Sequence, residues 1–179
     1  MHSVDPVSPR AEGEPPKRSW LAALAASSAF AVPLAMSMSS SPAPIHPVVM
    51  GWYLSLRKPW FKPPDVLIPL AWTGVEAGLA VAAYRLLRAA PSATRSGALA
   101  LLACNTVAIG GWSRLFFGRR NIGGSVVAAG AMVASGAVFV QQAGKIDRVS
   151  ARAGVPFVAW VGFATLLTAA IWQLNRAQR

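Results

Sequence analysis

Side chains that hold metals or transfer protons are scarce in this sequence. Its 179 residues include six acidic residues, two histidines and one cysteine, Cys104. A single cysteine excludes a disulfide within the chain. Because Cys104 lies in an apolar stretch, we expect it to be a small buried side chain. The sequence also lacks zinc-ligand spacing, a glycine-rich phosphate loop and a nucleophilic serine motif, so its motifs predict no catalytic residue and no metal site.

Charged residues are also scarce, and long apolar stretches take their place. Charged side chains make up 13% of the chain and hydrophobic ones 54%, against about 25% and 45–50% in soluble domains. About 20 apolar residues span a bilayer as a helix. Too little polar surface would remain to cover several such helices in water, so we predict an all-α integral multi-pass membrane protein. The five candidate spans of its bundle are Trp20–Met38, Val66–Leu87, Ala98–Phe117, Gly123–Ala143 and Gly154–Leu174.

The net charge of +11 does not indicate a nucleic-acid partner. The basic residues are scattered over tails and connections and form no stripe along one helix, so lipid headgroups of the bilayer are the expected partner. With five spans, about nine basic residues would lie on one side and about eight on the other, which leaves the orientation open. The host membrane stays open between a bacterial cell envelope and an organelle membrane: mitochondrial outer, endoplasmic reticulum or secretory.

Composition divides the chain into three regions. Residues 1–18 are polar and rich in proline and predict a disordered tail. Residues 19–175 form the membrane domain, and residues 176–179 are a short basic tail. The first apolar segment, which follows Lys17 and Arg18, fits either a first membrane helix or a cleaved signal peptide.

The later apolar stretches are joined by short connections, which predict antiparallel neighbours in one bundle. Glycines at four-residue spacing, such as Gly74 and Gly78, favour close helix contact either within the bundle or in a dimer. Only the first connection, about Ser39 to Asp65, is long.

This long connection contains the stretch GWYLSLRKPWFKPP, which combines aromatic rings, cations and prolines. Pro63 and Pro64 suit the first turn of a helix, where a missing N–H costs nothing, and Asp65 favours the positive end of the helix dipole. The aromatic and basic residues allow two interpretations. They anchor the chain at headgroup depth, or they form a lid whose rings stack on a flat apolar ligand while its cations meet acidic groups.

Three motifs in order carry a resemblance to a known family. WYLSLRKPWFKPP precedes Trp72, WSRLFFGRRNIG begins at Trp112, and PFVAWVGFATLL with IWQLN lies near the end of the chain. Within five apolar spans, they resemble the tryptophan-rich sensory protein and translocator protein family (TspO/MBR), formerly the peripheral-type benzodiazepine receptors. The resemblance covers about residues 20–175. It implies a five-transmembrane-helix bundle, often a homodimer, with a pocket that opens toward the first connection as its lid.

The resemblance also implies ligands. Members bind porphyrins, haem and synthetic isoquinoline or benzodiazepine compounds, and some bind sterols, so a tetrapyrrole is expected here as ligand and not as an obligatory cofactor. Arg57 and Lys62 are added to the expected contacts because, with Lys58, they could meet the propionates. His46 is an alternative axial haem ligand. The contacts expected by position are Trp52, Tyr53, Lys58, Ile68, Trp72, Trp112, Trp160, Ala164 and Leu167.

Several wall positions depart from the family pattern. Gly124 and Ala128 stand where members often have tryptophan and aspartate, and Thr168 stands where they have asparagine. We therefore expect a roomier and less polar pocket. Ala169 replaces the tyrosine of the proposed sterol motif, so sterol ranks below tetrapyrrole as the expected ligand.

Glu76 is a carboxylate near the centre of the second apolar stretch, where the family usually has tyrosine. A carboxylate at that depth costs about 2.5–3.5 kcal/mol on insertion scales, so it is protonated, paired or facing a wet cavity. It follows Trp72 by four residues and lies on nearly the same helix face. One hypothesis is that Glu76 contacts a ligand's polar or cationic group, or a coordinated metal. The alternative is a hydrogen bond to a neighbouring helix or an ion pair with Arg114.

The residues and the resemblance together predict a membrane protein that binds and handles tetrapyrroles, as a sensor or a transporter. Two alternatives stay open. One is light-dependent degradation of bound porphyrin, in which the ligand supplies the reactive oxygen chemistry, and the other is binding and transport of sterol or lipid. Apart from the first alternative, we expect binding and not enzymatic catalysis.

Overall fold

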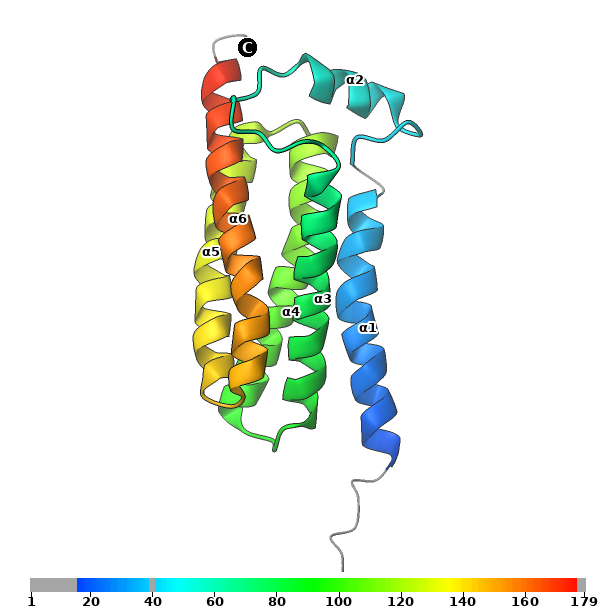
Figure 1. Ribbon diagram of the computed structural model, residues 1–179, viewed down its shortest axis with the longest axis vertical. Helices are drawn as coiled ribbons and strands as arrows, with labels where there is room; N and C mark the ends of the chain where they lie inside the picture. Colours follow the sequence, from blue (N-terminus) through cyan, green and yellow to red (C-terminus); the bar gives the residue numbers. More distant parts are fainter. Residues whose placement is uncertain (1–15, 39–40, 177–179) are drawn as a thin grey trace, which may run out of the picture.

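The computed structural model describes residues 16–38 and 41–176, which form a bundle of long helices with a short helix across one end (Figure 1). No strand occurs in these residues, which confirms the all-α prediction for this part of the chain. In chain order the elements are α1 (Pro16–Met38), α2 (Pro47–Ser55), α3 (Leu67–Arg88), α4 (Ala93–Ser113), the π-helix η1 (Arg114–Gly118), α5 (Ile122–Gly144) and α6 (Arg148–Asn175).

Four segments are long and apolar enough to cross a membrane: α3, α4 with η1, α5 and α6. They support the predicted membrane bundle. The predicted first span is also helical, as α1, but its apolar stretch Ala22–Pro33 is shorter. α1 lies alongside α3 and α4 (Figure 1) and buries Ala22 and Ala26. The bundle is therefore shown, whereas a fifth crossing stays a prediction.

The predicted tails fall mostly outside the described residues. Residues 1–15 and 177–179 lie there. The three residues 16–18, which we assigned to the polar tail, begin α1. Arg176 directly follows α6.

The prediction for Cys104 is wrong, because its side chain is exposed. α4 buries Leu102, Asn105, Thr106 and Ile109, which follow the spacing of one helix face. Cys104 lies two residues after Leu102 and so points away from that face. An apolar segment alone does not say which of its sides meets the other helices.

Short polar sequences begin three of the long helices. Ser92, Asn121 and Asp147 are the N-caps of α4, α5 and α6, and each side chain accepts a hydrogen bond from the backbone N–H three residues further on. These bonds satisfy amide groups that a helix start leaves without partners. The chain therefore turns sharply at each cap, and consecutive helices run antiparallel as predicted (Figure 1).

α5 and α6 approach each other where glycines face aromatic rings. Gly136 lies against the ring of Phe157, and Gly154 lies against the ring of Phe139. A Cβ atom added to either glycine would stand 2.7 Å from a ring carbon. Both rings are fully buried, so this reciprocal packing requires the smallest residue at both positions.

The long first connection crosses one end of the bundle (Figure 1). It contains α2 and a non-helical stretch with turns, residues 56–66, that returns to the start of α3. We call residues 47–66 the lid. At the opposite end, Arg85 of α3 donates hydrogen bonds of 2.7 and 2.8 Å to the two carboxylate oxygens of Asp147, which precedes α6.

Candidate functional site

A cavity of about 480 Å³ lies between the helices beneath the lid. Its lining comes from the chain before α2, from α2 and the rest of the lid, and from α3, α4, η1, α5 and α6, so it lies between the helices and the connection that crosses them. Pockets that hold small ligands occupy about 300–1,000 Å³ and are mostly apolar with a few placed polar groups. The size and the mostly apolar lining of this cavity match that description.

Tryptophan and phenylalanine rings form much of the cavity wall. Trp72 of α3 meets Trp160 of α6 edge to face, with ring centroids 6.4 Å apart and planes at 89°. Trp112 of α4 stacks on Phe116 of η1 at 5.0 Å and 15°. The indole N–H of Trp112 donates a 2.9 Å hydrogen bond to the backbone oxygen of Ser125, which fixes its ring. Rings held in this way offer faces and edges to a flat apolar ligand.

The π-helix η1 explains how two consecutive phenylalanines reach the same cavity. Successive residues of an α-helix point about 100° apart. In η1 the N–H of Arg119 bonds to the oxygen of Arg114, five residues earlier, at 2.9 Å, which widens the turn. Phe116 and Phe117 both line the cavity. The Phe117 ring also packs edge to face on the ring of Tyr53 in the lid, with ring centroids 5.8 Å apart. Such single π-turns occur frequently at functional sites.

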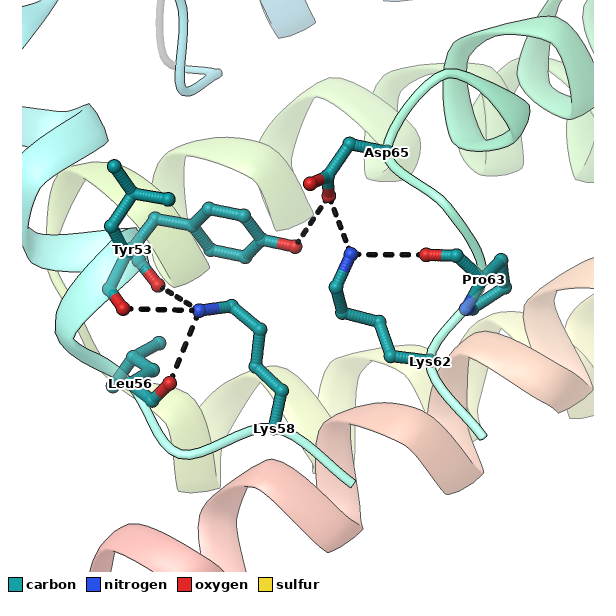
Figure 2. A network of polar contacts seen from close by, with 7 residues as sticks. Tyr53, Leu56, Lys58, Lys62, Pro63 and Asp65 are labelled. Carbon is teal, nitrogen blue, oxygen red and sulfur yellow. Dashed lines mark hydrogen bonds and ion pairs between the residues drawn. The ribbon is translucent and has the colours of Figure 1, made fainter. Parts of the chain in front are cut away.

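A network of polar contacts holds the lid together (Figure 2). The ammonium group of Lys58 donates to the backbone oxygens of Tyr53 and Leu56 at 2.6 and 3.1 Å and lies 4.5 Å from the centre of the Tyr53 ring. The Tyr53 hydroxyl donates to Asp65 at 3.4 Å. Asp65 also pairs with Lys62 at 2.6 Å. The end of α2 is thereby tied to the residues just before α3.

Burial and charge set the protonation of these lid residues. Burial, with added effects of the Asp65 charge and hydrogen bond, raises the pKa of Tyr53 to about 12. The hydroxyl therefore keeps its proton and serves as a donor. Burial, and then the charge of Lys62, lowers the pKa of Lys58, while Asp65 partly offsets this. In this arrangement Lys58 and Lys62 hold the lid itself.

Asn175 at the end of α6 holds the middle of the lid from below. Its side-chain oxygen accepts a 3.0 Å hydrogen bond from the backbone N–H of Arg57, and its amide nitrogen donates to the backbone oxygen of Arg57 at 2.9 Å. The same nitrogen donates a 2.7 Å hydrogen bond to the backbone oxygen of Ile171. One buried amide therefore satisfies both backbone groups of a lid residue, while the Arg57 residue itself is exposed.

The cavity and the lid lie in the part of the chain that matches a known family. The sequence matches the TspO/MBR family over residues 25–173. The chain belongs to this family. The resemblance seen in its three motifs is thereby confirmed, and the four membrane-spanning helices are consistent with an integral membrane protein.

Several relatives of this TspO/MBR protein cover most of its length. It is 28% identical to protein CrtK of Rhodobacter capsulatus over 135 residues, which cover 72% of this chain and 81% of the relative. It is 26% identical to the translocator protein of Homo sapiens over 141 residues, covering 75% and 81%. It is 30% identical to the tryptophan-rich sensory protein of Cereibacter sphaeroides over 125 residues, covering 69% and 77%.

Most of the contact residues predicted for this TspO/MBR protein meet around one cavity. They come from the lid, α3, α4 and α6, so the fold brings together residues more than 100 positions apart. The predicted residues in the lining are Tyr53, Ile68, Trp72, Glu76, Trp112, Trp160, Ala164 and Leu167.

Five other candidates lie outside this lining in the described structure. Arg57, Lys58 and Lys62 belong to the lid contacts described above. Trp52 packs edge to face on Phe116 at 5.6 Å, so it supports the wall from behind. His46 is the N-cap of α2, and its Nδ1 lies 3.2 Å from the backbone oxygen of Ser41.

Glu76 of this TspO/MBR protein is part of the cavity wall. It is 3% exposed, and its Oε2 atom has no hydrogen-bond partner among the described residues. Among the described residues, ion pairs join Lys62 to Asp65 and Arg85 to Asp147. The alternative ion pair with Arg114 is therefore not formed, and Arg114 is exposed.

Among the residues of the cavity and lid that sequence reasoning missed, three show why it missed them. Phe163 and Met132 line the cavity, and Asn175 binds the lid. Phe163 follows Trp160 by three residues, and that helical spacing could have identified it. No pattern links Asn175 to Arg57, because the two are 118 positions apart.

Proposed function

We propose that this TspO/MBR protein binds a tetrapyrrole, porphyrin or haem, in the cavity beneath the lid and handles it within the membrane as a sensor or transporter. The observation that carries the proposal is a cavity inside a membrane bundle whose wall is built from the rings of Trp72, Trp112 and Trp160. Aromatic walls of this kind bind large flat apolar groups through stacking and edge-to-face contacts. The names of two relatives, a translocator and a sensory protein, are compatible with this role.

The proposed orientation places the carboxylates of the ligand near the lid. A carboxylate buried at bilayer depth is costly, whereas the lid carries cations at one end of the bundle. The Arg57 residue is exposed there and offers a guanidinium for a carboxylate. The apolar part of the macrocycle would then lie among the rings of α3 and α6.

A titration with protoporphyrin IX tests the proposal. Porphyrin absorption is recorded while the purified protein is added in detergent, for the wild type, Trp160→Leu and Trp172→Leu. We expect saturable binding that weakens about tenfold in Trp160→Leu, because a wall ring is lost. Trp172 is the matched control, since it belongs to the same helix but is exposed and outside the cavity lining. Its replacement should leave the affinity unchanged.

Two results would reject a tetrapyrrole in this cavity. One is an absorption change that does not saturate with added protein. The other is an equal result in both variants: an equal loss of affinity would place the porphyrin on the outer surface of α6, and no loss in either would place it away from Trp160 or in the detergent micelle.

A further inference from the structure

The inner end of the cavity is marked by Glu76 and Trp160. α3 begins at the lid with Leu67, and Glu76 is the last of its residues in the lining, about 14 Å along the helix at 1.5 Å per residue. α6 runs in the opposite direction and reaches the lid at Asn175. Trp160 is the first of its residues in the lining, about 22 Å before Asn175. Both side chains therefore lie at the end of the cavity farthest from the lid.

Both side chains bring a polar atom without a protein partner to this end. Glu76 Oε2 and Trp160 Nε1 are buried and have no hydrogen bond within the described residues. Their helix faces meet, because Trp72, one turn before Glu76, touches the Trp160 ring. Burying unpaired polar groups costs stability, and two such groups in one cavity wall indicate a binding role.

We infer that Glu76 and Trp160 form a hydrogen-bonding subsite for the leading edge of the ligand. An indole N–H can only donate, so the ligand atom facing Trp160 must accept. A carboxyl group donates and accepts when protonated and only accepts when ionised, so a ligand group that can both donate and accept suits Glu76 in either state. A hydroxyl, a lactam or a primary amide does both. A ligand carboxylate is disfavoured there, because burying its charge at this depth is costly.

This inference rests on the proposed function, because it assumes that the cavity holds a flat ligand. It narrows the class of that ligand. With carboxylates near the lid, the edge that reaches Glu76 carries a hydroxyl or lactam group. The cavity therefore selects an oxygenated tetrapyrrole over one whose inner edge is entirely hydrocarbon.

A matched series of pyrenes tests the subsite, because its members share one flat ring and differ in one substituent. The probes are 1-pyrenemethanol, 1-pyrenecarboxamide, 1-pyrenecarboxylate and 1-methylpyrene, and their binding to the full-length protein in detergent is followed by energy transfer from tryptophan. We expect the alcohol and the amide to bind about tenfold more tightly than methylpyrene. The carboxylate should bind more weakly than the amide.

Three variants assign the effect to the two atoms. Glu76→Met and Trp160→Phe should each reduce the preference for alcohol over methylpyrene while methylpyrene still binds. Glu76→Gln is the matched control, because an amide keeps both a donor and an acceptor and should preserve the preference.

Thermal unfolding of the ligand-free protein gives a second measurement. Glu76→Met should melt at the same or a higher temperature, since it removes an unpaired buried carboxyl.

The inference is overturned if the wild type binds alcohol and methylpyrene equally, or if the preference survives in both Glu76→Met and Trp160→Phe. Its failure is separable from failure of the proposed function. If the protein prefers 1-pyrenemethanol over 1-methylpyrene through Glu76 but binds no porphyrin, the tetrapyrrole is rejected and the subsite is kept. If it binds porphyrin but shows no such preference, the proposed function is kept and the subsite is rejected.

Displacement of bound 1-pyrenemethanol then distinguishes two sources of such a group. Displacement by the dimethyl ester of a linear tetrapyrrole with lactam ends supports an oxygenated tetrapyrrole. Displacement by a sterol alone supports the subsite but assigns it to a sterol hydroxyl. Displacement by neither would contradict the assignment of ligand class.

Discussion

At the scale of single residues, a few polar side chains decide how the lid lies on the bundle. Asn175 is 7% exposed and is the side chain of α6 that binds both backbone groups of Arg57. Buried backbone groups that lose their partners cost about 1–3 kcal/mol. The position of the lid therefore depends strongly on this one amide.

We expect Asn175→Ala to loosen the lid and to lower the free energy of unfolding by about 1–3 kcal/mol, because the Arg57 backbone groups lose their partner. Limited digestion with trypsin, followed at the bond after Arg57, measures this loosening. Cleavage should be faster in Asn175→Ala than in the wild type. Gln173→Ala is the control, since Gln173 is exposed on the same helix. Equal cleavage of all three proteins would show that Asn175 does not hold the lid.

At the scale of elements, the distance between α5 and α6 depends on where glycine occurs. Gly136 touches the Phe157 ring, whereas a Cβ at Gly130, almost two turns earlier on α5, would meet nothing within 4 Å. Glycine inside a helix costs about 0.5–1 kcal/mol relative to alanine. Packing therefore requires glycine at position 136 despite this cost, but does not require it at position 130.

This difference predicts opposite effects of the same substitution. Gly136→Ala should lower the free energy of unfolding by about 1–3 kcal/mol, because the added methyl group overpacks a buried contact. Gly130→Ala should leave it unchanged or raise it by about 0.5–1 kcal/mol. Both are measured by denaturant unfolding in the same detergent. If the two variants proved equally stable, the close approach of α5 to the Phe157 ring would not be the reason for glycine at position 136.

At the scale of the whole molecule, the two ends of the bundle are held by different chemistry. The lid end relies on hydrogen bonds to backbone groups, from the Lys58 ammonium and the Asn175 amide, and on the ion pair of Lys62 with Asp65. At the other end, Asp147 caps α6 and binds Arg85 of α3. The Arg85 guanidinium, helped by hydrogen bonds from Ser150, holds the pKa of Asp147 well below its usual range.

The depressed pKa makes this end of the bundle sensitive to acid. A group whose pKa is lowered in the folded state stabilises it above the unfolded-state value, about 3.9 for aspartate, and this stabilisation is lost as the pH falls through the folded-state value. Asp147→Asn keeps a capping side chain but loses the charge. We expect it to melt at a lower temperature than the wild type at pH 7, and the difference should shrink as the pH falls below about 4.

Melting temperatures between pH 7 and pH 2 check this expectation. Arg152→Gln is the control, because Arg152 is an exposed cation near the start of α6, and its difference from the wild type should not follow the same course. A constant difference between wild type and Asp147→Asn across this range would contradict the role of the Asp147 charge.

The outcome for particular residues shows how far sequence reasoning reaches. The apolar lengths predicted the membrane helices α3 to α6, since bilayer thickness fixes the number of residues that a span needs. The spacing from Trp72 to Glu76 placed both residues on one face, and both line the cavity. The same reasoning failed for Cys104, because every side of a membrane helix can be apolar and the pattern does not tell a lipid-facing side from a packed one.

The sequence by itself determined the all-helical membrane bundle, the family and most of the aromatic wall, because these depend on segment length, composition and short motifs. Only the tertiary structure decided what Lys58, Lys62 and Asn175 do, since their partners are set by how the connection folds back over the bundle. It also decided that Glu76 faces the cavity without a protein partner. A local pattern fixes a helix face, but hydrogen-bond partners that are distant in sequence follow from the packing of the whole chain.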